Sequence, residues 1–456
     1  MNQCDVIIIG GGPGGYPLAL QAAKSGASVT LIERDQFGGT CLNWGCIPTK
    51  ALLASAQQFH RFRHAADYGL TADNIGYDWN AVLQRKATIV TKLRAGIEQM
   101  LKTAKVNVVR GDARVYADRH VEVTSAGWAG QADKVVIATG SSVAIPGMVP
   151  PDRKTFWSSD EALSAECVPE TLLVIGGGVI GLEMGQMFAD FGAKVTIVEM
   201  MPQILPGLDT AVAKRLLPVF KKSGLEIFVG TKVESLQATP AGAVAVFAGQ
   251  ERSFQRVLVA TGRRPNRSCC EGTGIALELE GQAIKVDAAF QTSIQGIYAL
   301  GDCTPGPMLA HRATYDAMVM AAQWRGEKIT ADYRHMPACV YTRPEISWFG
   351  LNEDAAREQQ PPVRVGRSQF AANGKAMCAG EAEGQVKLLV SAEGRLVGGV
   401  LWGPETSNLI SEGVALAATG VDLRQSLLHA VHPHPTLAEI MGETLGAATG
   451  IGGAHS

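Results

Sequence analysis

Residues 6–15 read Val-Ile-Ile-Ile-Gly-Gly-Gly-Pro-Gly-Gly, and residues 172–181 read Leu-Leu-Val-Ile-Gly-Gly-Gly-Val-Ile-Gly. Each apolar run predicts a buried strand, and each glycine cluster predicts a turn into the helix that follows. In both copies a second strand ends on a glutamate, Glu33 or Glu199, 23 positions after the first glycine. The chain therefore carries an internal repeat of strand, turn, helix and strand.

This repeat has the features of a dinucleotide site. Glycines let the backbone of the turn approach a pyrophosphate, which lies at the N-terminus of the helix, and a carboxylate at the second strand's end accepts hydrogen bonds from a ribose diol. One Gly-x-Gly-x-x-Gly motif is weak evidence, but here strand, helix and glutamate accompany it twice. Two Ala-Thr-Gly segments, at 138–140 and 260–262, each end a further buried strand, as a strand that closes such a site would. The sequence predicts two dinucleotide-binding domains of α/β class.

Two cysteines follow the first unit in the segment Cys41-Leu-Asn-Trp-Gly-Cys46. Cysteines five positions apart can close a small ring, so they can cycle between dithiol and disulfide. A structural bridge would be unusual in a chain without an export signal, and a zinc site would need two further ligands at regular spacing, which do not stand out. We interpret the pair as redox-active. The other seven of the nine cysteines, including Cys269 and Cys270, are interpreted as ordinary thiols.

Composition limits the remaining possibilities. A chain of 456 residues has room for roughly three domains. Its net charge of -2 gives no reason to expect nucleic acid or an acidic membrane surface as a partner. The strand-like run begins at residue 6, which leaves no room for a signal peptide, and no apolar run is long enough to span a membrane. We expect a cytoplasmic enzyme, although a mature organellar protein without its leader would look the same.

The texture of the sequence changes at about Met336. Short alternating strands at 386–390 and 397–401 precede helical stretches around 407–420 and 423–430. This part holds no dinucleotide motif, so we expect a separate α+β domain. The chain then closes on the segment His432-Pro-His-Pro-Thr-Leu-Ala-Glu439.

With these residues in view, the chain resembles the dihydrolipoamide dehydrogenases, the FAD-containing disulfide reductases of 2-oxo acid dehydrogenase complexes. The likeness runs nearly end to end, through both nucleotide units and the segments 38–50, 301–302, 307–311, 341–345, 370–376 and 432–439. It implies two Rossmann-like domains, for FAD and NAD, and a C-terminal α+β dimerisation domain. The implied boundaries are 1–147 for FAD and the redox disulfide, 148–268 for NAD, 269–335 for a return to the central domain, and 336–456 for dimerisation.

The resemblance also implies which residues hold the cofactors. The FAD site would consist of Gly10, Gly12, Gly15, Glu33, Thr40, Lys50, Ala113, Thr139, Gly140, Asp302, Met308, Ala310 and His311. The NAD side would consist of Gly176, Gly178, Gly181, Glu183, Glu199, Val233 and Gly262. A carboxylate at Glu199 repels a 2′-phosphate, and methionines rather than arginines follow it, so NAD is preferred to NADP. No metal is expected.

For catalysis, the resemblance implies that Cys46 faces the flavin and Cys41 exchanges with dihydrolipoyl substrate. His434, held by Glu439, would be the base and would act on the disulfide of the partner subunit in a homodimer. Lys50 would place its charge near the flavin, paired with the glutamate at 183. From local sequence alone, the histidines could instead lie in a turn that caps a helix, and Lys50 could be a solvated surface residue; the match with the family favours the catalytic roles.

Several alternatives stay open at this point. A glutathione reductase-like enzyme would want basic residues after the second unit's last strand, and a mercuric reductase would carry a terminal cysteine pair that is absent here. A flavoprotein scaffold that binds NADH without turnover is disfavoured by the presence of Cys41, Cys46, His434 and Glu439 together. Trp44 stands where relatives carry a small branched residue, which leaves substrate preference open. The expected partner is a lipoylated acyltransferase or carrier protein, whose complex the sequence does not identify.

Overall fold

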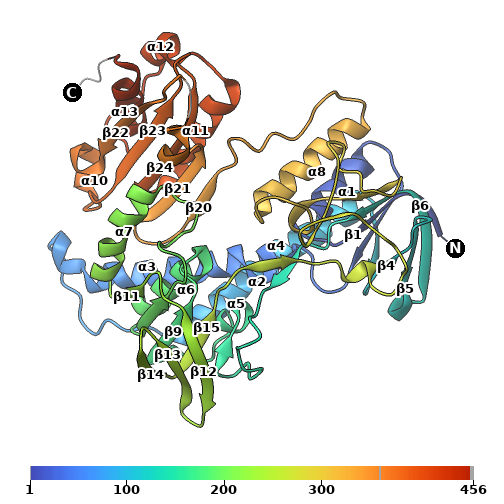
Figure 1. Cartoon of the computed structure of the whole chain (residues 1–456), viewed down its shortest axis with the longest axis horizontal. Coiled ribbons are helices and arrows are strands. Elements are labelled where there is room, and N and C mark those ends of the chain that lie inside the picture. The colour runs from blue at the N-terminus through green and yellow to red at the C-terminus, as the bar shows by residue number, and fades with distance from the viewer. Residues whose placement is uncertain (1, 359–360, 452–456) are drawn as a thin grey trace.

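The computed structural model describes residues 2–358 and 361–451, which form three large sheets covered by helices (Figure 1). The first sheet has the strand order β3-β2-β1-β6-β5-β4, with β19 beside β6. Its central strands β1 (Asn2–Ile9), β2 (Val29–Glu33), β6 (Trp128–Ile137) and β19 (Ile297–Ala299) are parallel. Because Ile9 aligns with both Ile32 and Ile137, the residues that follow these strands meet at one edge. Ligands of open α/β sheets bind at this edge.

The second sheet repeats this construction. Its order is β11-β10-β9-β15-β8, and β9 (Thr171–Ile175), β10 (Lys194–Val198) and β15 (Arg256–Val259) are parallel, with Ile175 aligned to Val198 and to Val259. A small antiparallel sheet of β12 (Val233–Thr239), β13 (Gly242–Phe247) and β14 (Gln250–Phe254) shares an apolar cluster with it. The predicted α/β fold with two nucleotide-type units is confirmed.

Besides the helix at Thr210–Lys222, five long helices in the described part of the chain pack against these sheets. They are α1 (Gly15–Lys24), α3 (Cys46–Arg63), α4 (Trp79–Thr103), α6 (Val179–Asp190) and α8 (Ala310–Trp324). Although α3 follows the first unit in sequence, its buried face, with Leu52 and Leu53, belongs to the same apolar cluster as Leu182 and Met184 of α6. The helix that begins at Cys46 is therefore packed against the second unit (Figure 1).

The third sheet is antiparallel and has the order β20-β21-β24-β23-β22. Its strands are β20 (Ala338–Val340), β21 (Glu345–Gly350), β22 (Arg364–Gln369), β23 (Gln385–Val390) and β24 (Leu396–Gly403), and helices α11 (Thr406–Thr419) and α13 (Glu439–Thr449) pack on it. The expected α+β domain is confirmed. The helix expected over 423–430 is only partly right: α12 ends at Ser426 and a 3-10 turn follows. Pro433 and Pro435 disfavour helical backbone at His432 and His434, and the helix has already ended by then.

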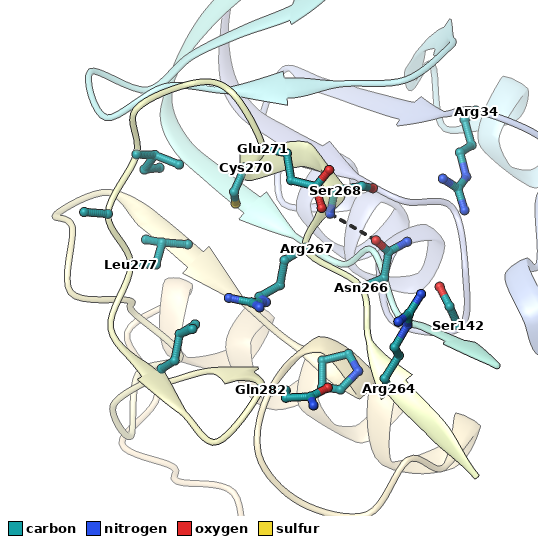
Figure 2. A pocket seen from close by; sticks show the side chains of 14 residues that line it. Arg34, Ser142, Arg264, Asn266, Arg267, Ser268, Cys270, Glu271, Leu277 and Gln282 are labelled. Carbon is teal, nitrogen blue, oxygen red and sulfur yellow. Dashed lines mark hydrogen bonds between the residues drawn. The ribbon is translucent and has the colours of Figure 1, made fainter. Parts of the chain in front are cut away.

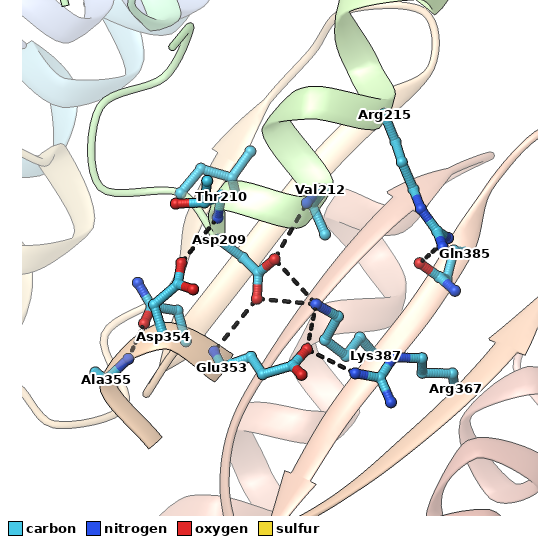
Figure 3. Close-up of polar contacts among 12 residues, drawn as sticks. Asp209, Thr210, Val212, Arg215, Glu353, Asp354, Ala355, Arg367, Gln385 and Lys387 are labelled. Carbon is cyan, nitrogen blue, oxygen red and sulfur yellow. Dashed lines mark hydrogen bonds and ion pairs between the residues drawn. The ribbon is translucent and has the colours of Figure 1, made fainter. Parts of the chain in front are cut away.

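A buried ionic cluster joins the second and third sheets (Figure 3). Asp209 caps α7 (Thr210–Lys222) by accepting from an N–H of its first turn, and Lys387 of β23 lies 2.9 Å from both carboxylate oxygens of Asp209. The same Nζ lies 2.8 Å from Glu353 of α9 (Glu353–Ala356), which in turn accepts from Arg367 at 2.6 Å. The side chains of Lys387 and Asp209 are almost fully buried. Loss of one partner would leave an uncompensated charge, so the cluster fixes this contact between units.

The remaining regular elements are short. They are α2 (Gly39–Trp44), α5 (Ser159–Ala162), α10 (Gly374–Cys378), α12 (Leu423–Ser426), β3 (Asn107–Arg110), β4 (Arg114–Val115), β5 (His120–Val123), β7 (Ser141–Val143), β8 (Phe156–Trp157), β11 (Leu225–Phe228), β16 (Arg263–Pro265), β17 (Leu279–Glu280) and β18 (Ala283–Ile284), with several 3-10 turns. Within the described ranges, no helix combines the length and apolarity needed to cross a membrane.

Candidate active site

The first glycine turn is closed by contacts that admit no side chain. A Cβ on Gly10, whose φ is +108°, would lie 2.3 Å from the carbonyl oxygen of Ala138, and one on Gly15 would lie 1.8 Å from the Gly10 carbonyl oxygen. The N–H of Gly11 donates to Glu33 at 2.7 Å. The turn therefore holds the Glu33 carboxylate beside its own amides at the end of β2.

The second turn has the same contacts. A Cβ on Gly176 would lie 2.4 Å from the carbonyl oxygen of Ala260, and one on Gly181 would lie 2.0 Å from the Gly176 carbonyl oxygen. The N–H of Gly177 donates to Glu199 at 2.7 Å. The sequence repeat thus extends to the same hydrogen bond between the middle glycine and the strand-end glutamate.

Other glycines of the two units border open space. Apart from the adjoining residues of the chain, no heavy atom lies within 4 Å of a Cβ built on Gly140, Gly178 or Gly262, and one on Gly12 would touch only the Cα of Gly39, at 3.6 Å. A side chain at these positions would enter space that the protein itself does not fill. The two turns therefore fit dinucleotides whose pyrophosphates approach the backbone closely.

An arginine that the sequence analysis missed ties the first site to the second unit. Asp302 accepts from the Ser141 hydroxyl at 2.6 Å, and Arg263 donates to the Ser141 hydroxyl and carbonyl oxygens, each at 2.7 Å. Arg263 also donates to the Thr40 hydroxyl at 3.3 Å. Its position directly after Gly262 is the one signal that could have pointed to it. The Arg263 contacts bring Thr40 and Asp302 to the same edge of the first sheet.

The other expected cofactor residues are more dispersed. Ala113 and Val233 are buried apolar residues, and Thr139 donates from its hydroxyl to the carbonyl oxygen of Asn266 at 2.6 Å. Met308, Ala310 and His311 lie at the start of α8, where a ring nitrogen of His311 is 2.7 Å from the carbonyl oxygen of Pro337.

A break between two helices brings the redox cysteines together. Helix α2 ends at Trp44 and α3 begins at Cys46, and a Cβ on Gly45 between them would lie 2.9 Å from the carbonyl oxygen of Thr40. Both cysteines are free thiols, and their side chains share a hydrogen bond. The break therefore places the two predicted cysteines beside each other, where each affects the acidity of the other.

The two thiols differ in acidity. The hydrogen bond from Cys41, and then the charge of Lys50, lower the pKa of Cys46 to about 7. Donation of that hydrogen bond and burial raise the pKa of Cys41. Cys46 also occupies the N-terminus of α3, a position that favours a thiolate. The electrostatics therefore make Cys46 the thiolate of the reduced pair near neutral pH.

Lys50 is held by residues from two other parts of the chain. Its Nζ lies 2.7 Å from Glu183, whose side chain is 3% exposed, and 4.5 Å from the ring centroid of Tyr341. The backbone N–H of Tyr341 donates to the other Glu183 oxygen at 2.9 Å. The expected Lys50–Glu183 pair is present. The sequence did not predict the contacts that Tyr341 makes with Lys50 and Glu183, although Tyr341 lies in one of the segments that resemble the family.

The closing segment forms a histidine–carboxylate pair. Nδ1 of His434 lies 2.8 Å from Glu439, and the second Glu439 oxygen accepts from the N–H of Thr436 at 2.8 Å. Both bonds lower the pKa of Glu439, and the bond from Thr436 has the larger effect. His434 is 77% exposed and uses only Nδ1 for this bond, whereas His432 is mostly buried against Glu412 at 2.9 Å. The geometry leaves Nε2 of His434 available to an incoming group.

The base and the cysteines are not assembled within one chain. Among residues 2–358 and 361–451, no hydrogen bond or ion pair joins His434 to Cys41 or Cys46. The helix bearing the cysteines packs on the second unit, whereas His434 precedes α13 on the third sheet (Figure 1). One chain therefore supplies each half of the expected centre separately.

Comparisons with known proteins agree with this geometry. Residues 4–317 match the model of the pyridine nucleotide-disulphide oxidoreductases, and residues 336–445 match the dimerisation domain of the same group. The dihydrolipoyl dehydrogenase of Zymomonas mobilis is 36% identical to this chain, and the match covers 98% of both chains. That of Thermus scotoductus is 38% identical, and the match covers 96% of both chains.

Solved structures give the same result. LpdA from Mycobacterium tuberculosis superposes with a TM-score of 0.89 at 26% identity, covering 98% of this chain and 99% of that one. The HOCl-induced flavoprotein disulfide reductase RclA from Escherichia coli superposes with a TM-score of 0.87 at 27% identity, covering 97% of this chain and 99% of that one. By its sequence, its fold and its terminal dimerisation domain, this chain belongs to the pyridine nucleotide-disulphide oxidoreductase family.

Proposed function

We propose that this chain is a dihydrolipoyl dehydrogenase that oxidises protein-bound dihydrolipoamide to lipoamide and reduces NAD+ to NADH. The observation that carries the proposal is the Cys41–Cys46 pair beside the Lys50–Glu183 ion pair, in a chain whose curated relatives named above bear this name. Gly10, Gly12, Gly15, Glu33 and Asp302 would hold FAD, which when bound would supply an acceptor for the electron pair between the thiols and NAD+.

The acidity of the two thiols gives the direction of substrate exchange. A dihydrolipoyl thiolate attacks the Cys41 sulfur of the oxidised pair, a bond forms between these sulfurs, and the Cys41–Cys46 bond breaks to release the Cys46 thiolate. Thiol exchange is faster when the departing sulfur has the lower pKa, and that of Cys46 is about 7. The second dihydrolipoyl thiol loses its proton to solvent, and its sulfur attacks the substrate sulfur of the mixed disulfide, which forms lipoyl disulfide and releases Cys41, reprotonated as a thiol. Two electrons have passed to the cysteine pair.

The first attack requires a base because free thiols are mostly protonated at neutral pH. Nε2 of His434 takes the proton from the dihydrolipoyl thiol, and Glu439, bonded to Nδ1, stabilises the imidazolium that forms. Nε2 of the His434 imidazolium later returns this proton to the departing sulfur of Cys41. Because one chain keeps His434 apart from Cys41, each base would serve the cysteine pair of the partner subunit.

Substrate turnover tests the proposal. The purified holoenzyme is assayed for dihydrolipoamide oxidation with NAD+ and, separately, for reduction of glutathione disulfide with NADPH. We expect the first reaction to dominate. Dominance of the second reaction, or absence of both in a preparation with bound FAD, would refute the assignment.

Subunit mixing tests the shared site. Cys41→Ser and His434→Ala chains are each expected to be inactive with dihydrolipoamide, but a mixed dimer contains one unaltered cysteine pair facing one unaltered histidine. After unfolding and refolding of an equal mixture, random pairing would restore about a quarter of the wild-type activity, because half the dimers carry one complete site. No recovery, with dimers shown to form, would place the base in the same chain.

The domain boundaries and the partner belong to this proposal. We assign 1–147 and 269–335 to the FAD domain, 148–268 to the NAD domain and 336–456 to the dimerisation domain, in line with the residues of the three sheets. The substrate carrier would be a lipoylated acyltransferase or carrier protein. Affinity capture from the source cell, with and without enzymatic removal of lipoyl groups, identifies it; capture that does not depend on lipoylation would contradict a carrier role.

A further inference from the structure

A second pair of thiols lies outside the site described above. Cys269 and Cys270 belong to the 3-10 turn Ser268–Cys270, and their sulfurs are 3.8 Å apart. Cys269 is 3% exposed and packs in the apolar cluster behind the first sheet. Cys270 is half-buried and lines a cavity of about 650 Å³ (Figure 2). One sulfur of the pair is therefore at the wall of a cavity and the other lies directly behind it.

The surroundings give the two thiols different pKa values. Three arginines line the cavity, Arg34, Arg264 and Arg267. The hydrogen bond from Cys269, and then the charge of Arg267, lower the pKa of Cys270. Donation of that bond and burial raise the pKa of Cys269. A thiolate-prone sulfur at the cavity wall, backed by a protonated one, is the arrangement of a reactive thiol and its resolving partner.

We propose that Cys269 and Cys270 form a second redox site, at which a peroxide entering the arginine-lined cavity oxidises the two thiols to a disulfide within the turn. The Cys270 sulfur attacks one peroxide oxygen and the O–O bond breaks, which leaves a sulfenic acid on Cys270 and releases the other oxygen as water. The Cys269 sulfur then attacks that of Cys270, the S–S bond forms, and the sulfenic oxygen leaves as water with the Cys269 proton. Two thiols lose two electrons, and one peroxide becomes two waters.

The product would be easy to reverse. Neighbouring Cα atoms are about 3.8 Å apart, below the roughly 4.4 Å at which unstrained disulfides begin. A strained disulfide is more readily reduced, so thiol reductants should restore the pair. The site does not depend on the proposed function, because it uses neither Cys41 nor Cys46.

A third thiol offers the main competing product. Cys303 is fully buried in the same cluster as Cys269 and donates to the carbonyl oxygens of Ile137 and Leu300, at 3.3 and 3.2 Å. Burial raises the pKa of Cys303 to about 12, which makes it a poor nucleophile. We therefore expect closure between the neighbouring cysteines rather than between Cys269 and Cys303.

Peptide mapping of the holoenzyme separates these products. Trypsin cuts after arginine and lysine, so the three thiol groups fall into different peptides: 35–50 holds Cys41 and Cys46, 268–285 holds Cys269 and Cys270, and 286–312 holds Cys303. The holoenzyme is exposed to graded hydrogen peroxide, unfolded, alkylated and digested. We expect peptide 268–285 to lose two hydrogens and to take up no alkyl group, and dithiothreitol before alkylation to reverse both changes. Two alkyl groups on 268–285 when Cys41–Cys46 is fully oxidised, or a link between 268–285 and 286–312, would overturn the proposal.

Variants keep the test independent of folding. In Cys270→Ser, which alters the half-buried thiol, Cys269 should stay fully alkylated after peroxide. In Cys303→Ala the closed form of 268–285 should still appear to the wild-type extent. Persistence of the mass loss in Cys270→Ser, or its disappearance in a folded Cys303→Ala protein with bound FAD, would show that the proposed pair is wrong.

Discussion

The bond between His434 and Glu439 gives the sharpest test of the proposed base. Replacing Glu439 with Gln keeps the size of the side chain but removes its charge and one acceptor oxygen. In the native chain the two carboxylate oxygens accept separately from His434 Nδ1 and from the N–H of Thr436, both at 2.8 Å. A glutamine has one acceptor for these two donors, so one of them faces an NH2 group.

The size of the effect follows from the bond that is lost. A hydrogen bond to a charged group contributes about 1.5–3 kcal/mol. If it acts on the imidazolium that forms during proton transfer, its loss slows dihydrolipoamide turnover by about 10-fold to 150-fold, at about 1.4 kcal/mol per tenfold. Removal of the base itself, in His434→Ala, should cost about 10²–10⁴. The turnover rate of Glu439→Gln should therefore lie between those of the wild type and His434→Ala.

The assay compares two reactions of each variant. Dihydrolipoamide oxidation with NAD+ needs the base, whereas NADH-dependent reduction of an artificial dye does not, so only the first rate should fall. Glu412→Gln is a matched control, because Glu412 holds His432 at 2.9 Å in a pair that the mechanism does not use. Equal losses in Glu439→Gln and Glu412→Gln, or parallel losses of both reactions, would refute the role of His434.

Three further changes test other parts of the structure. In Lys50→Met the pKa of Cys46 should rise from about 7, so the pH midpoint for iodoacetamide alkylation of the reduced enzyme at this residue should move upward; an unchanged midpoint would contradict the charge effect. In Lys387→Met the buried carboxylate of Asp209 loses its cation, whereas Glu353 keeps Arg367, and the free energy of unfolding should fall by about 3–5 kcal/mol in thermal or denaturant melts. Lys285→Met, at a lysine that is 57% exposed, should cost little by comparison. Gly178→Ala places a methyl group in open space and should raise KM for NADH without lowering the melting temperature.

The parts of the fold that the sequence predicted well depend on local rules. A strand, a glycine turn and a helix are specified within a few residues, and the turn tolerates no side chain because a Cβ on Gly10 or Gly176 would strike a neighbouring carbonyl oxygen. The close backbone contacts that require glycine at these positions also shape the turn that forms the site. The motif in the sequence therefore predicts the local structure. The helix expected over 423–430 shows the limit of periodicity, because α12 ends at Ser426 and a 3-10 turn follows although the apolar spacing continues.

The parts that local sequence could not predict depend on partners far away in the chain. Lys50 meets Glu183 across 133 positions, and Arg263 meets Thr40 across 223. Read locally, Lys50 looked like a surface lysine, and only the family resemblance gave it a partner. Neither Arg263 nor Tyr341 received a role, because an arginine or tyrosine in a loop carries no periodic signal.

The reactivity of Cys46 consequently depends on the arrangement of all three parts of the chain. Its helix begins beside the first nucleotide unit, Glu183 comes from α6 of the second, and Tyr341 follows β20 of the third sheet. Lys50 lies where these parts meet, and its charge lowers the pKa of the thiol. A displacement of either neighbouring unit would move the carboxylate or the ring that fixes this charge. Because the attraction between the ammonium and the thiolate weakens with distance, the redox centre keeps its acidity only while the three units stay packed as they are.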